Sequence, residues 1–194
     1  MIDLKGSYED FVNALGERES GNNYHIKNTL GYLGRWQFGK MRLTDVGLMK
    51  RNDGGGFEWI EGMDELKFCS GKGWEKVAMG FLAVGGNEED VSFAKLVQDK
   101  AIYDSTDNWI KQAVYFSVAS RIGEAVNGIV ITLSGIVAGA HLKGMGSSKY
   151  PGVIQFVREG VDSADAFGTK ISEYIESFGG YDLSRFLRMP EKGA

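Results

Sequence analysis

Apolar side chains near the start of the chain recur with the period of an α-helix. Four of them stand at positions i, i+3, i+4 and i+7: Tyr8, Phe11, Val12 and Leu15. Side chains at this spacing lie on one face of a helix, so the pattern predicts an amphipathic helix over residues 8–19. Ser7 and Asp10 have the spacing of a capping box at its start, and Gly21 favours a stop just after its end.

Beyond residue 73 the pattern is predominantly helical. Apolar residues recur there at helical spacing in several stretches, most of them beside a residue that can cap or stop a helix. We expect helices over residues 74–82, from Asn87 toward Ala119, from Thr132 to Leu142, over Ile154–Val157 with Pro151 in its first turn, and over Ile171–Phe178 with Thr169 as its cap.

The region between these two parts is rich in Gly, Asn and aromatic residues. The run Asp53–Gly56 contains three consecutive glycines and cannot be helix interior. A helix is expected over residues 34–49. Two further segments are short strands or loops packed by their own aromatics, and the pattern does not separate these alternatives: 57–60 and 65–69. The chain therefore predicts a mainly α fold with a small irregular or β insert near residues 50–73.

Composition makes this an ordinary globular chain. With 194 residues, 43% hydrophobic and 25% charged, a single domain over residues 1–194 is expected. The net charge of −4 argues against a nucleic-acid binder that relies on counterion release. The start of the chain lacks the pattern of a secretory signal, and the most apolar stretch, 128–142, is too short to cross a bilayer. We therefore expect no membrane insertion.

Few residue types are available for catalysis. The chain has two histidines and one cysteine, Cys69, whose surroundings do not match a nucleophile motif, so carboxylate acid chemistry remains. Glu19 is the best local candidate, because the negative end of a helix dipole favours a protonated carboxyl group and nearby aromatics would desolvate it. The alternative is that Glu17 and Glu19 are both solvated surface charges.

Two segments favour Glu19 as a catalytic acid over Glu19 as a surface charge: Arg18-Glu19-Ser20-Gly21 and Gly31–Gly39, which reads GYLGRWQFG. Together they resemble the paired signature of the lysozyme-like superfamily shared by soluble lytic transglycosylases and goose-type lysozymes. The sequences of the two segments are most similar to those of muramidase-like peptidoglycan hydrolases of phages and of type VI secretion effectors. The resemblance implies an α+β lysozyme-like fold with Glu19 as the catalytic acid. It also implies a group of substrate-binding residues: Ser20, Tyr32, Trp36, Gln37 and Phe38. Trp36 and Phe38 have the alternative of being core residues.

Two later segments extend the resemblance toward the end of the chain. Ala138–Gly144 stands where the transglycosylases have an Ala-Tyr-Asn-Ala-Gly type segment, and here His141 replaces the tyrosine. Gly168-Thr169 followed by Tyr174 resembles the last element of the family. His141 and Tyr174 are thus implied to contact substrate or the acid, and each has the alternative of being a plain core residue.

The position of a second carboxylate is open, since none is singled out by a motif. The acids expected to border the site are Asp45, Asp53, Glu58, Glu61, Asp64 and Glu65. Hydrolysis needs such a group as base or nucleophile, whereas a transglycosylase uses the sugar's own N-acetyl or 6-hydroxyl group. Some of these acids also admit a calcium site, although a solvated acidic surface is the favoured interpretation and no metal or cofactor is expected.

The resemblance implies a peptidoglycan glycoside hydrolase that cleaves the β-1,4 bond between MurNAc and GlcNAc. The alternatives are a lytic transglycosylase that forms 1,6-anhydroMurNAc and a non-catalytic phage tail or wall-binding module. The implied partners are peptidoglycan glycan strands, a secretion machine and a periplasmic immunity protein. The expected location follows: synthesis in the cytoplasm without a signal peptide, export, and action in the periplasm of a target cell as an antibacterial effector.

Overall fold

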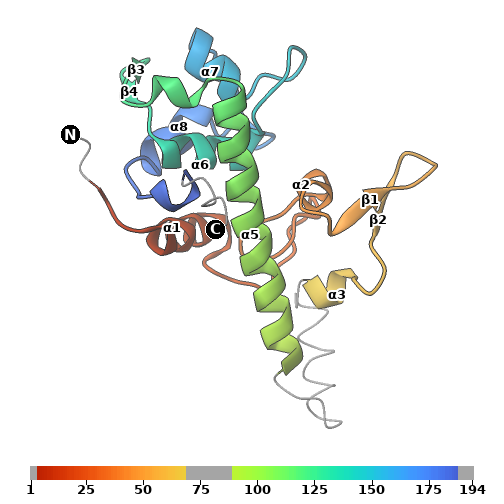
Figure 1. The fold of residues 1–194 in the computed structure, drawn as a ribbon. Coiled ribbons are helices and arrows are strands. Elements are labelled where there is room, and N and C mark those ends of the chain that lie inside the picture. Colours follow the sequence, from red (N-terminus) through yellow and green to blue (C-terminus); the bar gives the residue numbers. More distant parts are fainter. Residues whose placement is uncertain (1–3, 69–88, 188–194) are drawn as a thin grey trace, which may run out of the picture. The chain divides into compact units, whose positions relative to one another are not determined.

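The computed structural model describes residues 4–68 and 89–187, and for residues 89–94 it describes the backbone alone. The chain divides into two compact units, one of residues 1–14 with 106–194 and one of residues 15–105. The described elements are α-helices and two small antiparallel sheets. This content is compatible with the predicted mainly α fold with small β parts. The helices in Figure 1 are α1 (Tyr8–Ser20), α2 (Lys40–Asp45), α3 (Glu65–Phe68), α5 (Glu89–Tyr115), α6 (Leu133–Lys143), α7 (Val153–Glu159) and α8 (Ile171–Ser177).

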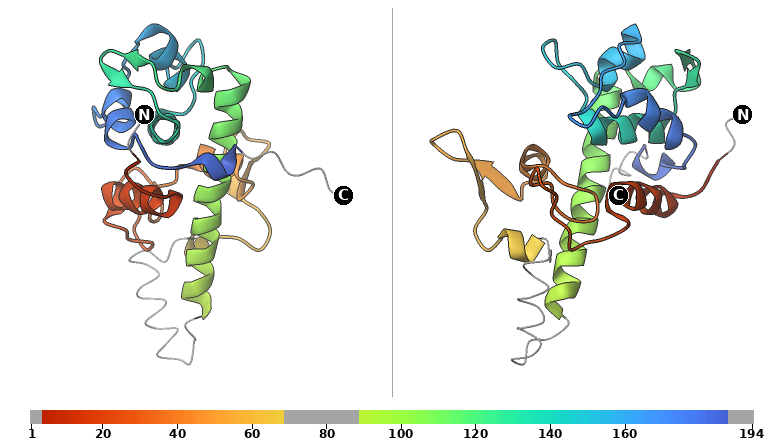
Figure 2. Two further views of the ribbon diagram at one scale, coloured as in Figure 1. Left: turned by 60° about the vertical axis from the view of Figure 1, so that its left-hand side comes forward. Right: turned by 180° about the vertical axis from the view of Figure 1, so that it is seen from behind.

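Unit 1, residues 1–14 and 106–194, is built around α6. Residues 134–140 of this helix are buried, and α7 and α8 pack against it (Figure 2). Thr132 begins α6 as predicted, since its Oγ1 accepts a hydrogen bond of 3.0 Å from the Gly135 amide. A side chain at Gly135 would place its Cβ 2.7 Å from the Ile175 carbonyl oxygen. The absence of a side chain at this position therefore sets how closely α8 approaches α6.

The first and last described segments of unit 1 pair with each other. The Lys5 amide donates to the Gly180 carbonyl at 2.7 Å, and the Asp182 amide donates to the Gly6 carbonyl at 2.8 Å. The predicted capping box of α1 is present, because the Ser7 amide donates to the Asp10 carboxylate at 2.8 Å and the Asp10 amide donates back to Ser7 Oγ at 3.2 Å.

Unit 1 also contains the short hairpin β3 (Ala125–Val126) and β4 (Ile129–Val130) and two 3-10 turns, Ala119–Arg121 and Ser184–Phe186. The helix predicted toward Ala119 ends earlier, at Tyr115. Ser117 adopts a left-handed backbone with φ of 56°, which breaks the helix, and the Val118 amide bonds back to the Ala113 carbonyl at 2.8 Å. The Asn87 cap and the helix over 74–82 lie outside the described residues.

Two predicted caps in unit 1 are wrong. Thr169 does not cap α8, because its amide donates to Asp165 Oδ1 in the preceding turn; the helix follows Lys170, whose amide donates to the Glu173 carboxylate at 3.2 Å. Pro151 lies before α7 rather than in its first turn. Gly152 is the N-cap there, with its amide donating to Gln155 Oε1 at 3.0 Å.

Unit 2, residues 15–105, contains the predicted β insert. The strands β1 (Met49–Arg51) and β2 (Phe57–Trp59) form an antiparallel hairpin in which Lys50 faces Glu58 (Figure 1). The segment 65–69, expected as strand or loop, is helical over Glu65–Phe68. Asp64 decides this outcome, because its carboxylate accepts a hydrogen bond of 2.7 Å from the Lys67 amide and so caps the turn.

The helix predicted over residues 34–49 is wrong in extent. Only Lys40–Asp45 is helical, and it packs against β1. Residues 33–38 form a tight turn instead, in which Leu33 and Phe38 exchange both backbone hydrogen bonds and Gly34 takes a φ of +73°. Backbone pairing across this turn therefore replaces the first helical turns.

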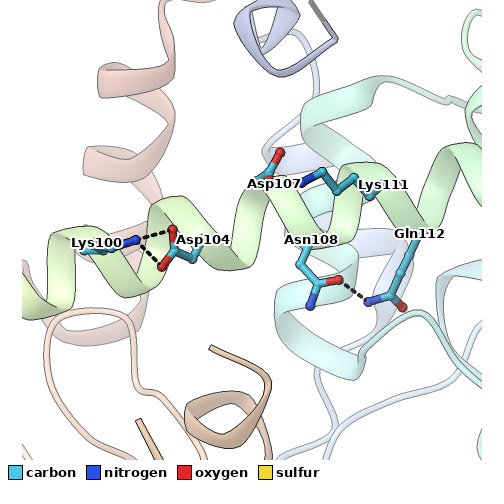
Figure 3. A network of polar contacts seen from close by, with 6 residues as sticks. All are labelled: Lys100, Asp104, Asp107, Asn108, Lys111 and Gln112. Atoms are coloured by element: carbon cyan, nitrogen blue, oxygen red, sulfur yellow. Dashed lines mark hydrogen bonds and ion pairs between the residues drawn. The ribbon is translucent and has the colours of Figure 1, made fainter. Parts of the chain in front are cut away.

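The helix α5 carries polar pairs along its surface at helical spacing. Lys100 and Lys111 bind Asp104 and Asp107 at 2.6 Å each, and the Gln112 amide donates to Asn108 at 2.9 Å (Figure 3). Pairs at i, i+4 support a helix by a few tenths of a kcal/mol each. Among the described helices, none is long and apolar enough to cross a membrane.

Candidate functional site

Ser20 joins the two segments singled out in the sequence, residues 18–21 and 31–39. It is the last residue of α1, and its hydroxyl donates to the Arg35 carbonyl at 2.7 Å and accepts from the Asn23 amide at 2.9 Å. Because a hydroxyl has one proton to donate, Ser20 is committed to the turn at 33–38. In the structure it holds the helix end against this loop, and its direct contact with substrate stays a prediction.

Glu19 stands one residue before Ser20 and is partly buried. It occupies the last turn of α1, where the carbonyl groups of the helix point toward the following loop. Glu17, the alternative surface carboxylate, is exposed and accepts a hydrogen bond of 2.9 Å from the Asn22 amide group. The two glutamates of this segment therefore have different surroundings, and Glu17 behaves as a surface charge.

Arg35 connects the loop to the end of α1. Its Nε donates to Asn22 Oδ1 at 2.7 Å and its Nη1 donates to the Tyr24 hydroxyl at 2.8 Å. The Tyr24 hydroxyl in turn donates to the Asp99 carboxylate at 2.6 Å. Desolvation, followed by the hydrogen bond to Asp99, raises the pKa of Tyr24 to about 12, so this hydroxyl keeps its proton at neutral pH.

Gln98 fixes the same loop from α5. This side chain is fully buried, and its Oε1 accepts from the Arg35 amide at 2.9 Å while its Nε2 donates to the carbonyls of Tyr24 and Phe68. A Cβ on Gly34 would lie 2.2 Å from that Oε1, so the loop approaches Gln98 at a residue without a side chain. One buried amide thus satisfies three backbone groups from three separate segments.

The predicted aromatic residues of the loop fall into two kinds. Trp36 and Phe38 are each 1% exposed, pack edge to face with ring centroids 6.2 Å apart, and continue into Tyr24 and Phe68. Neither ring offers a free face on which a sugar could stack. Trp36 and Phe38 are core residues beneath the loop, the second of the two interpretations that the sequence left open.

Tyr32 is the exposed aromatic of the loop, with 40% of its surface accessible. Its backbone is held at both ends by Asn28, whose Oδ1 accepts from the Tyr32 amide and whose amide donates to the Tyr32 carbonyl, both at 3.0 Å. The ring lies over Gly39, where a Cβ would come within 2.9 Å of it. Tyr32 is therefore a preorganised ring with an accessible surface.

Gln37 occupies a special backbone position in the turn. Its φ of 47° is left-handed, which is uncommon for a residue with a Cβ, and its side-chain amide donates to the Gly34 carbonyl at 2.9 Å. The side chain is partly exposed. The bond to Gly34 holds the side-chain amide against the turn, and the partly exposed residue is accessible at this point of the loop.

His141 and Tyr174 belong to unit 1 and are described with it. His141 stands near the end of α6, partly buried, with its ring edge to face with Trp109 at a centroid distance of 5.7 Å. Tyr174 on α8 is 5% exposed and packs against Phe178. Both side chains take part in the aromatic packing of unit 1, and their contact with substrate stays a prediction.

Three of the acids considered as second carboxylates are held in ion pairs. Asp45 pairs with Arg42 at 3.0 Å, Glu58 with Lys50 at 3.1 Å and Glu65 with Lys27 at 2.8 Å. Asp53 and Glu61 are exposed in turns. Within the residues that the structure describes, three or more His, Cys, Asp or Glu side chains do not gather in a group that could hold a metal ion.

Sequence reasoning missed the supporting roles of Arg35, Gln98 and Asp99. A signal existed for Gln98, because it falls on the helix stripe of Val97 and Ala101, where a polar residue is unexpected. Arg35 belongs to the segment Gly31–Gly39, but its partners are distant in the sequence or depend on the turn that brings them together.

Gln98→Leu is expected to lower the free energy of unfolding of the protein by about 2–4 kcal/mol, because leucine leaves an amide and two carbonyl groups without their buried partner. Urea denaturation measures this change. Gln112→Leu on the same helix is the control and should change stability by less than about 1 kcal/mol, since the Gln112 side chain is partly exposed and bonds to the side chain of Asn108, one turn earlier on the same helix. Equal effects of the two substitutions would contradict the role of Gln98.

Comparison with protein-family models, with curated proteins and with solved structures gives no match to this chain.

Proposed function

We propose that the chain is a peptidoglycan glycoside hydrolase of muramidase type, with Glu19 as the general acid. The observation that carries the proposal is the 2.7 Å hydrogen bond from Ser20 Oγ to the Arg35 carbonyl. This bond joins the end of α1, which carries Glu19, to the loop at residues 33–38. These are the two segments whose sequences resemble the lysozyme-like superfamily. A chance resemblance of two short segments would carry no expectation that they meet in space.

The proposed reaction begins with protonation of the glycosidic oxygen by Glu19. This step needs a neutral carboxyl group beside a sugar that is held in place, and the end of a helix favours the neutral form. Tyr32 provides an accessible ring for a sugar face, and Gln37 provides an amide for its hydroxyl or acetamido groups. Trp36 and Phe38 support the loop from beneath.

The product of the reaction distinguishes the two catalytic routes. A hydrolase adds water to the sugar carbon and releases a reducing MurNAc end, whereas a transglycosylase closes the sugar's own 6-hydroxyl on that carbon and releases 1,6-anhydroMurNAc. We propose hydrolysis, on the resemblance to phage and effector muramidases.

Mass spectrometry of sacculi digested with the purified chain tests this proposal. Reducing-end muropeptides are expected, and the anhydro products would be lighter by one water. Predominantly anhydro-muropeptides would replace the hydrolase by a lytic transglycosylase that uses the same acid. Sacculi that stay intact after incubation with a well-folded protein would favour the non-catalytic wall-binding module.

A further inference from the structure

Arg35 uses its main chain and its side chain to hold separate segments together. Its amide donates to Gln98, its carbonyl accepts from Ser20, and its guanidinium donates to Asn22 and Tyr24. The guanidinium carbon also lies 4.6 Å from the centre of the Trp36 ring. A single residue thus links the end of α1, the segment that follows it, and α5.

The segment that follows α1 reverses direction through two left-handed residues. Gly21 has a φ of 62° and Asn22 a φ of 58°, and the Asn22 amide bonds back to the Gly16 carbonyl at 3.0 Å. The left-handed conformation costs free energy for a residue with a Cβ, although asparagine tolerates it better than most. The side-chain bond from Arg35 Nε to Asn22 Oδ1 fixes Asn22 in this conformation.

The pair formed by Arg35 and Asn22 lies directly on the surface of α1. A Cβ on Gly16 would come within 2.6 Å of Asn22 Oδ1 and 2.7 Å of Arg35 Nε. Gly16 precedes Glu19 by three residues, and residues at this spacing are neighbours on a helix surface. The guanidinium group therefore braces the same side of the helix end that carries the proposed acid.

We propose that Arg35 is a positioning residue that holds the left-handed turn at Gly21-Asn22 and thereby fixes the end of α1 with Glu19. Its meaning for catalysis rests on the proposed function, whereas its effect on the helix end does not. The role requires arginine. Nε and Nη1 donate in one plane to two partners while the flat group lies over Trp36, and the single ammonium group of lysine cannot reproduce this arrangement.

The test compares Arg35→Lys with the matched control Arg51→Lys, an exposed arginine on the hairpin. Amide hydrogen exchange of residues 20–24 is expected to become roughly tenfold faster or more in Arg35→Lys, because the turn loses its brace. For glycan cleavage, kcat per folded molecule should fall about 10- to 100-fold with KM changed by less than about threefold, as for a misplaced catalytic group. Arg51→Lys should leave exchange and kcat as in the wild type.

Gly16→Ala provides a second test that leaves Arg35 in place. Alanine favours a helix over glycine by about 1 kcal/mol, so α1 is retained, while the new methyl group displaces the Asn22–Arg35 bond. The same faster exchange and lower kcat are expected. Wild-type exchange at residues 20–24 in both variants would overturn the proposal, as would a kcat loss that only follows the folded fraction. If the wild type cleaves no glycan, the proposed function fails and the exchange data alone decide the role of Arg35.

Discussion

Glu19→Gln is expected to reduce the release of muropeptides from purified sacculi by about 10²- to 10⁴-fold, while the thermal unfolding of the protein stays close to that of the wild type. Glutamine has the volume of glutamate and keeps a polar end at the last turn of α1, but it cannot deliver a proton to the glycosidic oxygen. The binding of glycan strands to the loop around Tyr32 should persist, so the loss should appear in kcat rather than in KM.

Glu17→Gln is the matched control, two residues earlier on the same helix. Its side chain is exposed and accepts a hydrogen bond from the Asn22 side chain, and glutamine keeps an oxygen that can accept that bond. Activity within about twofold of the wild type is expected, as for a surface substitution outside the site. A folded Glu19→Gln protein with wild-type turnover would remove Glu19 from the mechanism.

Periodicity predicted the helices where local signals and tertiary packing agree. The stripe from Tyr8 to Leu15 with the Ser7 cap gave α1 nearly to the residue, and Thr132 gave the start of α6. Prediction was poorer where the side chain or the backbone conformation of one neighbouring residue decided the type or the end of an element. Asp64 turned a possible strand into a helical turn, and Ser117 ended α5 before Ala119.

The candidate site was predictable as a set of segments but not as a set of roles. The motif named Ser20, Trp36 and Phe38 as substrate residues, because a sequence match does not tell whether a side chain faces solvent or core. The structure commits the Ser20 hydroxyl to Arg35 and buries both rings. Gln98 lies in a different part of the sequence, and its three backbone partners exist only after the loop and α3 have formed.

The proposed activity also predicts where the protein is harmful. Peptidoglycan lies outside the cytoplasmic membrane, so a muramidase made in the cytoplasm has no substrate there. The proposal includes delivery into the periplasm of a target cell, on the resemblance to type VI effectors. It also includes a periplasmic immunity protein that blocks the site in sibling cells. Because the chain has a net charge of −4, the proposed inhibitor is expected to present basic residues to it.

Fusion of the chain to a cleavable periplasmic signal is therefore expected to lyse the expressing cells, seen as a fall in culture turbidity after induction, whereas the same chain without the signal should leave growth unchanged. The matched control is Glu19→Gln with the signal, which reaches the same compartment in a folded form and should not lyse the cells. Lysis by the wild type and not by this variant attributes the damage to the acid rather than to the load on export. Equal toxicity from both compartments, or from neither at matched protein levels, would count against the wall as the target. In that case a non-catalytic binding module, such as a phage tail component, becomes the better account of the Ser20–Arg35 site.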